Sequence, residues 1–423
     1  MEERIIENAA VVLADRILPR ASVVIRDGLV ADIVAGGSRS ASPGTIDADG
    51  AYLIPGVIDL HNDNLEFEIH PRSSANLPLP FALATMERRL AAAGVTTEFH
   101  AISFQEQVRT GRTISDAGER AAFIAGYDDS PARAVRHHIL HRLDMRTPGV
   151  LGSALPSLRR VRVPYVSLND HTPGQGQYRD VERLIAMADA NRAMRSDETV
   201  DPEWYRERMR RGMEDTNTVP AFYQTVAEAA DHLPMIISTH DDDTVEKVDE
   251  QLLLGATVAE FPITVEAAAH ARRHGMAIIV GAPNIVRGGS QSGNLPAAEL
   301  VRQGLADIIC ADYHAPSLIP AAFRLVDDGL LGLSEAIRMI TRAPALAVGL
   351  TDRGEIAPGQ LADLCLVRRD GEGWPHVERT FVAGRESFAF LRYDATATGP
   401  RMSQAAERDA TSREYVGQEA VNE

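Results

Sequence analysis

The chain has 423 residues, of which 44% are hydrophobic and 24% are charged, and its formal net charge at pH 7 is −17. This length suits one barrel-sized domain with a smaller domain beside it. The acidic balance argues against nucleic-acid binding, because there is no basic surplus to neutralise phosphates. A small anionic substrate remains compatible with it, since a metal ion and a few Arg residues can make one pocket locally positive.

The chain also lacks the features of a secreted or membrane-bound protein. Its two cysteines, Cys310 and Cys365, provide no disulfide framework. No run approaches the roughly 18 apolar residues of a membrane span, and acids stand where a signal peptide has its basic start. We therefore expect a cytoplasmic protein that interacts with neither membrane nor nucleic acid.

Short β segments are predicted at both ends of the chain. Near the start, alternation predicts strands at residues 4–13, 22–26, 29–34 and 47–52. Near the end, it predicts a strand and a hairpin at residues 362–367 and 377–385. We expect the two ends to form one small β-sandwich from residues 1–55 and 350–390; two unrelated β extensions are the alternative. The tail, residues 391–423, has little apolar periodicity, which is typical of a mobile or partner-docking extension.

Between the ends, strand-like runs alternate with helical ones, which is the pattern of a parallel α/β architecture. Eight strand runs are predicted, at residues 57–60, 96–101, 136–143, 163–168, 235–239, 257–262, 277–281 and 307–311. They predict a (β/α)8 barrel over residues 56–349 with its active site at the carboxyl ends of the strands. The interval 175–218 is too long for a simple loop and is rich in Arg, so we predict a helical lid insertion.

Side chains that bind metal ions follow five of these predicted strands. The first strand ends in His61 and Asp63, which point the same way because they are two residues apart. The third, fourth, fifth and eighth strands are followed by Asp144, by Asp170 and His171, by His240 to Asp243, and by Asp312 to His314. Imidazoles and carboxylates suit Zn²⁺ or Mn²⁺. The surplus of ligands predicts two ions, which would lower the pKa of bound water from about 15.7 towards 7.

Each of these residues also has a structural interpretation. A single His at a strand end is often only hydrogen-bonded, and Asp170, Asp241 and Asp242 could cap helices. Glu98 and His100, at the end of the second strand, compete with Asp144 for the third-strand role. The only lysine, Lys247, lies in a helical stretch, so any bridging ligand should be an ordinary carboxylate. Six histidines lack strand-end placement and are predicted to be structural: His137, His138, His141, His232, His270 and His274.

A glycine-rich segment, residues 281–294, follows the seventh predicted strand. Glycines let backbone N–H groups approach an anion, and Arg287 offers a fork-shaped donor for phosphate oxygens. The segment therefore predicts a phosphate-binding loop, with an ordinary flexible loop as the alternative.

Taken together, these motifs resemble the amidohydrolase superfamily. The resemblance lies in His-x-Asp with Asn-Leu-Glu at residues 61–66, Asp-His-Thr-Pro-Gly-Gln at 170–175 and His-Asp-Asp at 240–242. Glu-Phe-Pro at 260–262, the segment 281–290 and Asp312-Tyr313 are more narrowly similar to the diphosphatase branch of the carbon–phosphorus lyase pathway, which serves phosphonate utilisation. The similarity extends over about residues 4–390.

The resemblance implies a metal-dependent hydrolase that releases pyrophosphate from a ribosyl 5-triphosphate, a small anionic phosphorylated substrate. It implies a metal set of His61, Asp63, Asp144, His171, His240 and Asp312, with Asp312 also accepting the proton of the attacking water. Substrate contacts are expected from Asn64, Asn284, Arg287, Gly288, Gly289, Ser290 and Gln291. Whether the chain forms a homo-oligomer is left open.

Three positions depart from the pattern of that branch. Gln291 stands where a His is usual, Asp144 where the carboxylate is normally Glu, and His100 where Asp is common. Each could mark a paralogue with a shifted substrate. A hydrolase of an amide, imide or cyclic ester with the same metal centre is therefore the alternative, and a catalytically inactive barrel used for binding is the third.

Overall fold

The computed structural model describes residues 3–36, 44–72, 75–106, 113–128, 130, 133–195, 201–290 and 293–390. The predicted tail at 391–423 lies outside the described residues. Every element named below belongs to the unit formed by Met1–Ala389.

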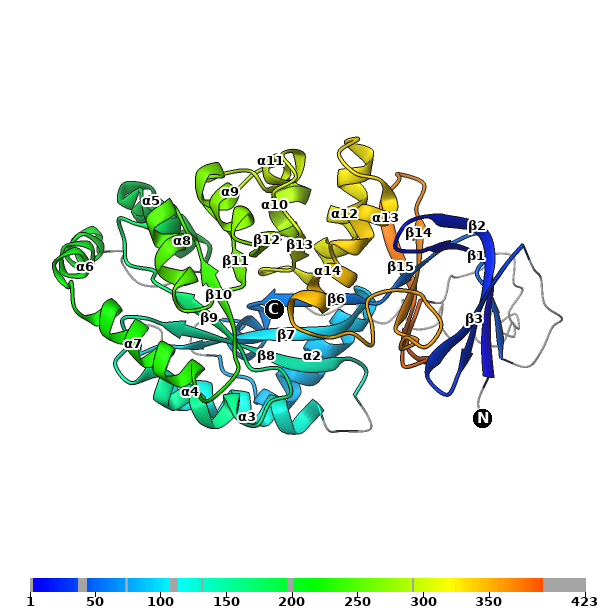
Figure 1. The fold of residues 1–423 in the computed structure, drawn as a ribbon, viewed down its shortest axis with the longest axis horizontal. Helices are drawn as coiled ribbons and strands as arrows, with labels where there is room; N and C mark the ends of the chain where they lie inside the picture. Colours follow the sequence, from blue (N-terminus) through cyan, green and yellow to red (C-terminus); the bar gives the residue numbers. More distant parts are fainter. Residues whose placement is uncertain are drawn as a thin grey trace, which may run out of the picture. The chain divides into compact units, whose positions relative to one another are not determined.

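Eight parallel strands form a nearly closed barrel, which confirms the predicted fold class (Figure 1). In sequence order they are β6 (Val57–Asn62), β7 (Val95–Phe104), β8 (Arg136–Asp144), β9 (Tyr165–Asn169), β10 (Ile236–His240), β11 (Val258–Glu260), β12 (Ala277–Gly281) and β13 (Ile308–Cys310). Each strand pairs with its neighbour in the chain. Two backbone hydrogen bonds join the last strand to the first at their carboxyl ends, from Asp312 N to His61 O and from Asp63 N to Asp312 O, each 2.8 Å long.

Some strands, such as β12, read as continuous apolar runs because both of their faces are covered, whereas β8 also contains His and Arg. Side chains of Ile58, Leu60, Phe99 and Leu140 belong to one buried cluster, to which Tyr165 also belongs. Other residues of the same strands pack in a second, larger cluster with the helices. The interior is therefore filled with side chains, and the open end carries the polar ones.

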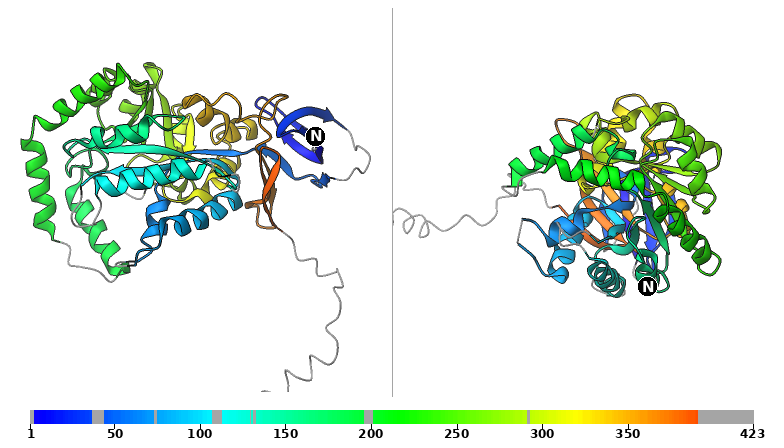
Figure 2. Two further views of the ribbon diagram at one scale, coloured as in Figure 1. Left: turned by 90° about the horizontal axis from the view of Figure 1, so that it is seen from below. Right: turned by 90° about the vertical axis from the view of Figure 1, so that its left-hand side faces the viewer.

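Helices surround the barrel strands (Figures 1 and 2). They are α1 (Asn64–Ile69), α2 (Leu79–Ala92), α3 (Ile114–Asp128), α4 (Val150–Leu158), α7 (Thr218–Ala230), α8 (Val245–Leu252), α9 (Val265–Arg273), α10 (Ala282–Arg287), α11 (Ala297–Arg302), α12 (Leu318–Asp327), α13 (Leu333–Arg338) and α14 (Arg342–Ala347). Two of them start with a threonine cap that satisfies a free backbone N–H: Thr244 accepts from Lys247 N and Thr264 from Ala267 N, each at 3.2 Å. These caps mark the starts of α8 and α9, a few residues after β10 and β11.

The two ends of the chain share a second sheet of eight strands. Its strands are β1 (Glu3–Val12), β2 (Ile17–Arg26), β3 (Leu29–Ala35), β4 (Thr45–Asp47), β5 (Tyr52–Pro55), β14 (Leu364–Arg369), β15 (Pro375–Val382) and β16 (Arg385–Ala389). Antiparallel pairing of β5 with β14 joins the N-terminal strands to the C-terminal ones. A separate buried cluster, including Ile6, Val23 and Phe381, forms the core of this sheet.

One predicted strand is wrong. Residues 48–51 form a turn between β4 and β5, in which Asp49 and Gly50 have positive φ angles of 46° and 75°. The Asp47 carboxylate holds the turn by accepting from Asp49 N at 2.8 Å. Such local bonding competes with strand pairing.

The predicted insertion at 175–218 is helical. It contains the short helix η2 (Gly176–Tyr178), then α5 (Val181–Arg195) and α6 (Pro202–Glu214). The Asn294 side chain donates to Gln177 O at 3.4 Å, so the insertion contacts the segment that follows α10. Within the described residues, no helix has the length and apolar character needed to cross a membrane.

Candidate metal centre

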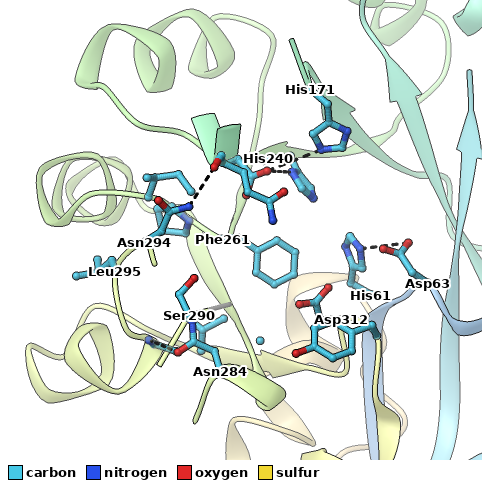
Figure 3. Close-up of a pocket in the computed structure, with 18 of the residues that line it drawn as sticks. His61, Asp63, His171, His240, Phe261, Asn284, Ser290, Asn294, Leu295 and Asp312 are labelled. Atoms are coloured by element: carbon cyan, nitrogen blue, oxygen red, sulfur yellow. Dashed lines mark hydrogen bonds and ion pairs between the residues drawn. The ribbon is translucent and has the colours of Figure 1, made fainter. Parts of the chain in front are cut away.

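A cavity of about 580 Å³ opens at the carboxyl ends of the barrel strands. Most of the predicted site residues line it: His61, Asp63, Asn64, His171, His240, Asn284, Arg287, Ser290 and Asp312. They come from segments spread along the sequence from position 61 to position 312, and the parallel barrel brings them to one end. Figure 3 shows His61, His240, Ser290 and Asp312 arranged around the ring of Phe261.

Two groups of three side chains in this cavity could each hold a metal ion. The Asp63 group consists of His61, Asp63 and Asp312, and the Asp241 group consists of His171, His240 and Asp241. Within each group, one potential ligand atom from every residue lies within 4.8 Å of the others. Mixed imidazole and carboxylate donors suit Zn²⁺ or Mn²⁺.

The Asp241 group contains buried donor atoms with no hydrogen bond. His240 Nδ1 and Asp241 Oδ2 lie 2.9 Å apart, yet neither has a hydrogen-bond partner in the described part of the chain. His171 Nε2 lies 3.8 Å from the same Asp241 oxygen. Burial, reinforced by His240, lowers the pKa of His171 to about 3, so its imidazole is neutral and free to bind a metal. Since buried polar atoms are normally paired, these donors fit a cation.

In the Asp63 group, Glu260 holds the His61 ring through its Nδ1 atom. Its Nδ1 lies 3.0 Å from Glu260 Oε2, which leaves Nε2 directed towards Asp63. Burial alone would raise the pKa of Glu260, but the facing His61 lowers it to about 2. A carboxylate behind a metal-binding imidazole is a common way of fixing its tautomer and orientation.

Asp63 makes its strongest contact with an arginine. Arg142, on β8, donates from Nη1 to Asp63 Oδ1 at 2.6 Å and from Nη2 to Asn169 Oδ1 at 3.3 Å. Burial would raise the pKa of the Asp63 carboxyl, but the Arg142 guanidinium lowers it well below its usual range. The third member of the group, Asp312, has a pKa raised to about 6, chiefly by burial.

Three residues around the cavity hold a left-handed backbone that side-chain-bearing residues rarely adopt. The φ angles are 57° for Asp241, 55° for Phe261 and 57° for Asp312. Asp241 and Phe261 directly follow β10 and β11, and Asp312 forms the β-bridge to Asn62. Such conformations cost free energy and concentrate at functional sites. The Phe261 ring packs edge-on against His61 and His240, with centroid distances of 5.2 and 5.4 Å.

The structure does not bring Asp144 to either group. Among the described residues its carboxylate accepts locally, from Arg146 N at 3.1 Å and Thr147 Oγ1 at 2.9 Å, and it does not line the cavity. Neither competitor replaces it. His100 does not line the cavity, and its Nε2 lies 2.8 Å from His137 Nδ1. Glu98 is buried beside Asp59.

The predicted phosphate loop is partly helical. Its first residues form α10, and Gly288, with φ 77°, ends that helix. Arg287 and Ser290 line the cavity, whereas Gly288 and Gly289 are not among its described lining residues. Asn284 lines the cavity too, but its Oδ1 accepts from Ala297 N at 3.0 Å, so it also holds the start of α11. Gln291 lies outside the described residues.

Sequence reasoning left Arg142, Glu260 and Phe261 out of the site, and it noted Asp241 at a strand end without including it in the expected metal set. Sequence signals could have found some of them. Glu260 lies in the predicted strand 257–262 and ends the observed strand β11, and Arg142 lies two positions before Asp144 on the same strand face. Glu260 and Phe261 also belong to the Glu-Phe-Pro motif that carries part of the family resemblance.

Comparisons with known proteins agree with this geometry. A family model described as the amidohydrolase family matches residues 230–388. The chain is 32% identical over 394 residues to the alpha-D-ribose 1-methylphosphonate 5-triphosphate diphosphatase of Escherichia coli (strain K12), covering 91% of this chain and all of that protein. It is 36% identical to a D-hydantoinase of Rhizobium radiobacter, but over only 29% of this chain and 24% of that one.

Solved structures show the same fold. A D-hydantoinase superposes with a TM-score of 0.61 at 14% identity, covering 92% of this chain and 96% of that chain. The dihydropyrimidinase of Brevibacillus agri NCHU1002 gives 0.60 at 14% identity, covering 91% and 95%. With a full-length relative above 30% identity as well, the chain belongs to the amidohydrolase superfamily and is a metal-dependent hydrolase.

Proposed function

We propose that this hydrolase is a diphosphatase of phosphonate metabolism, which releases pyrophosphate from a ribosyl 5-triphosphate and leaves the 5-phosphate. The observation that carries the proposal is that two arginines, Arg142 and Arg287, line the same cavity as both donor groups. Guanidinium groups match phosphate oxygens in charge and geometry, whereas a neutral amide has no use for them. The similarity to the alpha-D-ribose 1-methylphosphonate 5-triphosphate diphosphatase of Escherichia coli supports the same reaction.

The metal would be held by the Asp63 group and the Asp241 group, as two ions of Zn²⁺ or Mn²⁺. When bound, such ions lower the pKa of water and so supply a nucleophile near neutral pH. Glu260 keeps the His61 ring oriented. The backbone of Asp312 is held by its hydrogen bonds to His61 O and from Asp63 N, and these keep the Asp312 carboxylate at the cavity.

Asp312 is the residue best placed to accept the proton of the attacking water. It lines the cavity and belongs to the Asp63 group, so its carboxylate would lie beside a water held by the metal. In the reaction the water oxygen bonds to one phosphorus of the α,β-anhydride. The bond from that phosphorus to the bridging oxygen breaks, pyrophosphate leaves, and Asp312 Oδ takes the water proton.

Arg287 and Ser290 would hold the phosphate oxygens on the other side of the cavity. Figure 3 shows Ser290, Asn284 and Asn294 across Phe261 from Asp63, so the cavity can accept an elongated substrate. Donors that stay in place as charge develops on the oxygens stabilise the transition state.

The second candidate is hydrolysis of an amide, imide or cyclic ester. One observation favours it: part of the cavity wall is apolar, being formed by Phe261, Pro262, Ile263, Val280, Leu295 and Leu300. Such a wall suits an uncharged ring, and D-hydantoinases are among the proteins similar to this chain.

One assay separates the two candidates. The Mn²⁺-loaded protein is given α-D-ribose 1-methylphosphonate 5-triphosphate, and pyrophosphate release is measured beside ring opening of hydantoin and dihydrouracil. We expect pyrophosphate and no ring opening, and we expect Arg287→Ala to weaken the triphosphate reaction through KM. Arg302→Ala is the matched control, because Arg302 pairs with Glu299 and lies outside the cavity lining. Ring opening without pyrophosphate release would reject the proposal.

A further inference from the structure

The two donor groups of the cavity differ in how much their ligand atoms are already engaged. In the Asp241 group, His240 Nδ1 and Asp241 Oδ2 are buried and have no hydrogen-bond partner in the described part of the chain. In the Asp63 group, the Asp63 Oδ1 atom accepts a 2.6 Å hydrogen bond from Arg142. A cation entering the first group meets donor atoms in contact only with other members of that group, whereas one entering the second meets a carboxylate that already neutralises an arginine.

Arg142 is held in this place by more than Asp63. Its side chain is only 11% exposed, and its second terminal nitrogen donates to Asn169 Oδ1, at the end of the neighbouring strand β9. Buried charges are screened little by solvent or salt. The guanidinium therefore repels any divalent ion that binds beside Asp63, and this repulsion is strong because the groups are only a few ångströms apart.

Among the described residues, no arginine or lysine is in contact with the carboxylate of the Asp241 group. The nearby Arg146 pairs with Asp170 instead, with Nη2 3.0 Å from Asp170 Oδ2. The ionic contacts of Asp241 are with His240 and His171, and both of these are themselves potential ligands. The charge of Arg142 acts on both groups, but its direct contact is with the carboxylate of the Asp63 group.

We propose that the cavity contains two unequal metal sites, and that Arg142 sets the difference. The Asp241 group binds its ion first and tightly, and the Asp63 group binds a second ion more weakly because it competes with Arg142 for Asp63. Arg142 is in this sense a positioning residue that controls the occupancy of the second site. The inference rests on the proposed metal centre but not on the substrate, so the diphosphatase proposal and this one can fail separately.

The test is a titration of the metal-free full-length protein with Mn²⁺ alone, followed by calorimetry and by metal analysis after desalting. The wild type should show a tight and a weak event, and it should retain close to one ion after desalting. Arg142→Gln should tighten the weak event by at least about tenfold and leave the tight one unchanged. Arg142→Lys keeps the charge and should keep the second site weak, and Arg146→Gln, the matched control, should change neither event.

Two further variants assign the sites. Asp241→Asn should remove the tight event, and Asp63→Asn should remove the weak one. Equal affinity of the two ions in the wild type would overturn the proposal. So would a second event that Arg142→Gln leaves unchanged or weakens, or loss of the tight event in Asp63→Asn. If Arg142→Gln does not fold, the Asp63→Asn and Asp241→Asn pair still decides the order.

Discussion

Replacing Glu260 by Gln should weaken metal binding although it changes no side chain of the Asp63 or Asp241 group. Glu260 is fully buried and accepts from Tyr165 Oη at 2.8 Å, Ser167 Oγ at 3.0 Å and Ser238 Oγ at 2.7 Å. Its remaining contact is with His61 Nδ1 at 3.0 Å. An amide has the same shape, but it carries no charge and places an NH₂ group among these donors.

The magnitude follows from the pKa of Glu260. Burial raises this pKa, but His61 and the hydroxyl donors outweigh that effect and lower it from the ordinary 4.5 to about 2. At about 1.4 kcal/mol per factor of ten, the folded protein favours the ionised carboxylate by about 3 kcal/mol. A lowered carboxyl pKa stabilises the fold above the unfolded pKa, and this contribution is lost as the pH falls through the folded pKa. The variant should therefore be about 3 kcal/mol less stable at pH 7, and the difference should shrink below pH 4.5.

Metal affinity should fall too, because His61 loses the group that fixes its tautomer; such outer carboxylates typically contribute about 10- to 100-fold. The assays are urea unfolding of the metal-free protein and calorimetric titration with Mn²⁺. Tyr165→Phe is the matched control: it removes one donor but keeps the charge, so it should cost only about 1 kcal/mol and leave the metal affinity nearly unchanged. If Glu260→Gln binds metal as tightly as the wild type and is equally stable, Glu260 does not position His61.

Three further predictions follow from particular contacts. Asp312→Asn should keep at least one metal ion bound yet lose most turnover, measured by metal analysis and pyrophosphate release; near-native turnover would remove Asp312 from its proposed role. Burial lowers the pKa of His141 from 6.5 to about 4, so this His should cost stability as the pH falls from 6.5 towards 4, by up to about 3 kcal/mol. Urea unfolding of His141→Asn at pH 7 and about pH 4.5 should show a smaller pH dependence than the wild type; an equal one contradicts the assignment. A Cβ added at Gly56 would lie 2.8 Å from Thr96 Cβ, so Gly56→Ala should destabilise the protein by about 1–3 kcal/mol, with partial rescue by Thr96→Ala; additive effects in unfolding would argue against the clash.

The barrel could be predicted because its strands are simple in sequence. Several are short runs rich in branched apolar side chains, and strand β6, for example, begins at Val57 as predicted. The turn at 48–51 could not, because the Asp47 side chain and the left-handed Asp49 override the alternating pattern there. A local hydrogen bond of this kind does not change the alternation of apolar and polar residues from which strands are predicted.

The site could be predicted only as far as strand geometry reaches. Residues two apart on a strand share a face, which placed His61 with Asp63 in advance. Asp241 directly follows His240, so a regular strand would point it the other way; its left-handed φ of 57° turns it back beside His171. Arg142 was overlooked because an arginine is not a metal ligand, although its contact with Asp63 shapes the whole centre.

Locating the metal ions directly tests the central claim of this account. Crystals of the protein grown with Mn²⁺ should show anomalous scattering peaks at two places within one cavity. One peak should lie among His171, His240 and Asp241, and the other, weaker at limiting metal, among His61, Asp63 and Asp312. Peaks elsewhere in the molecule, with none among these six side chains, would contradict the account.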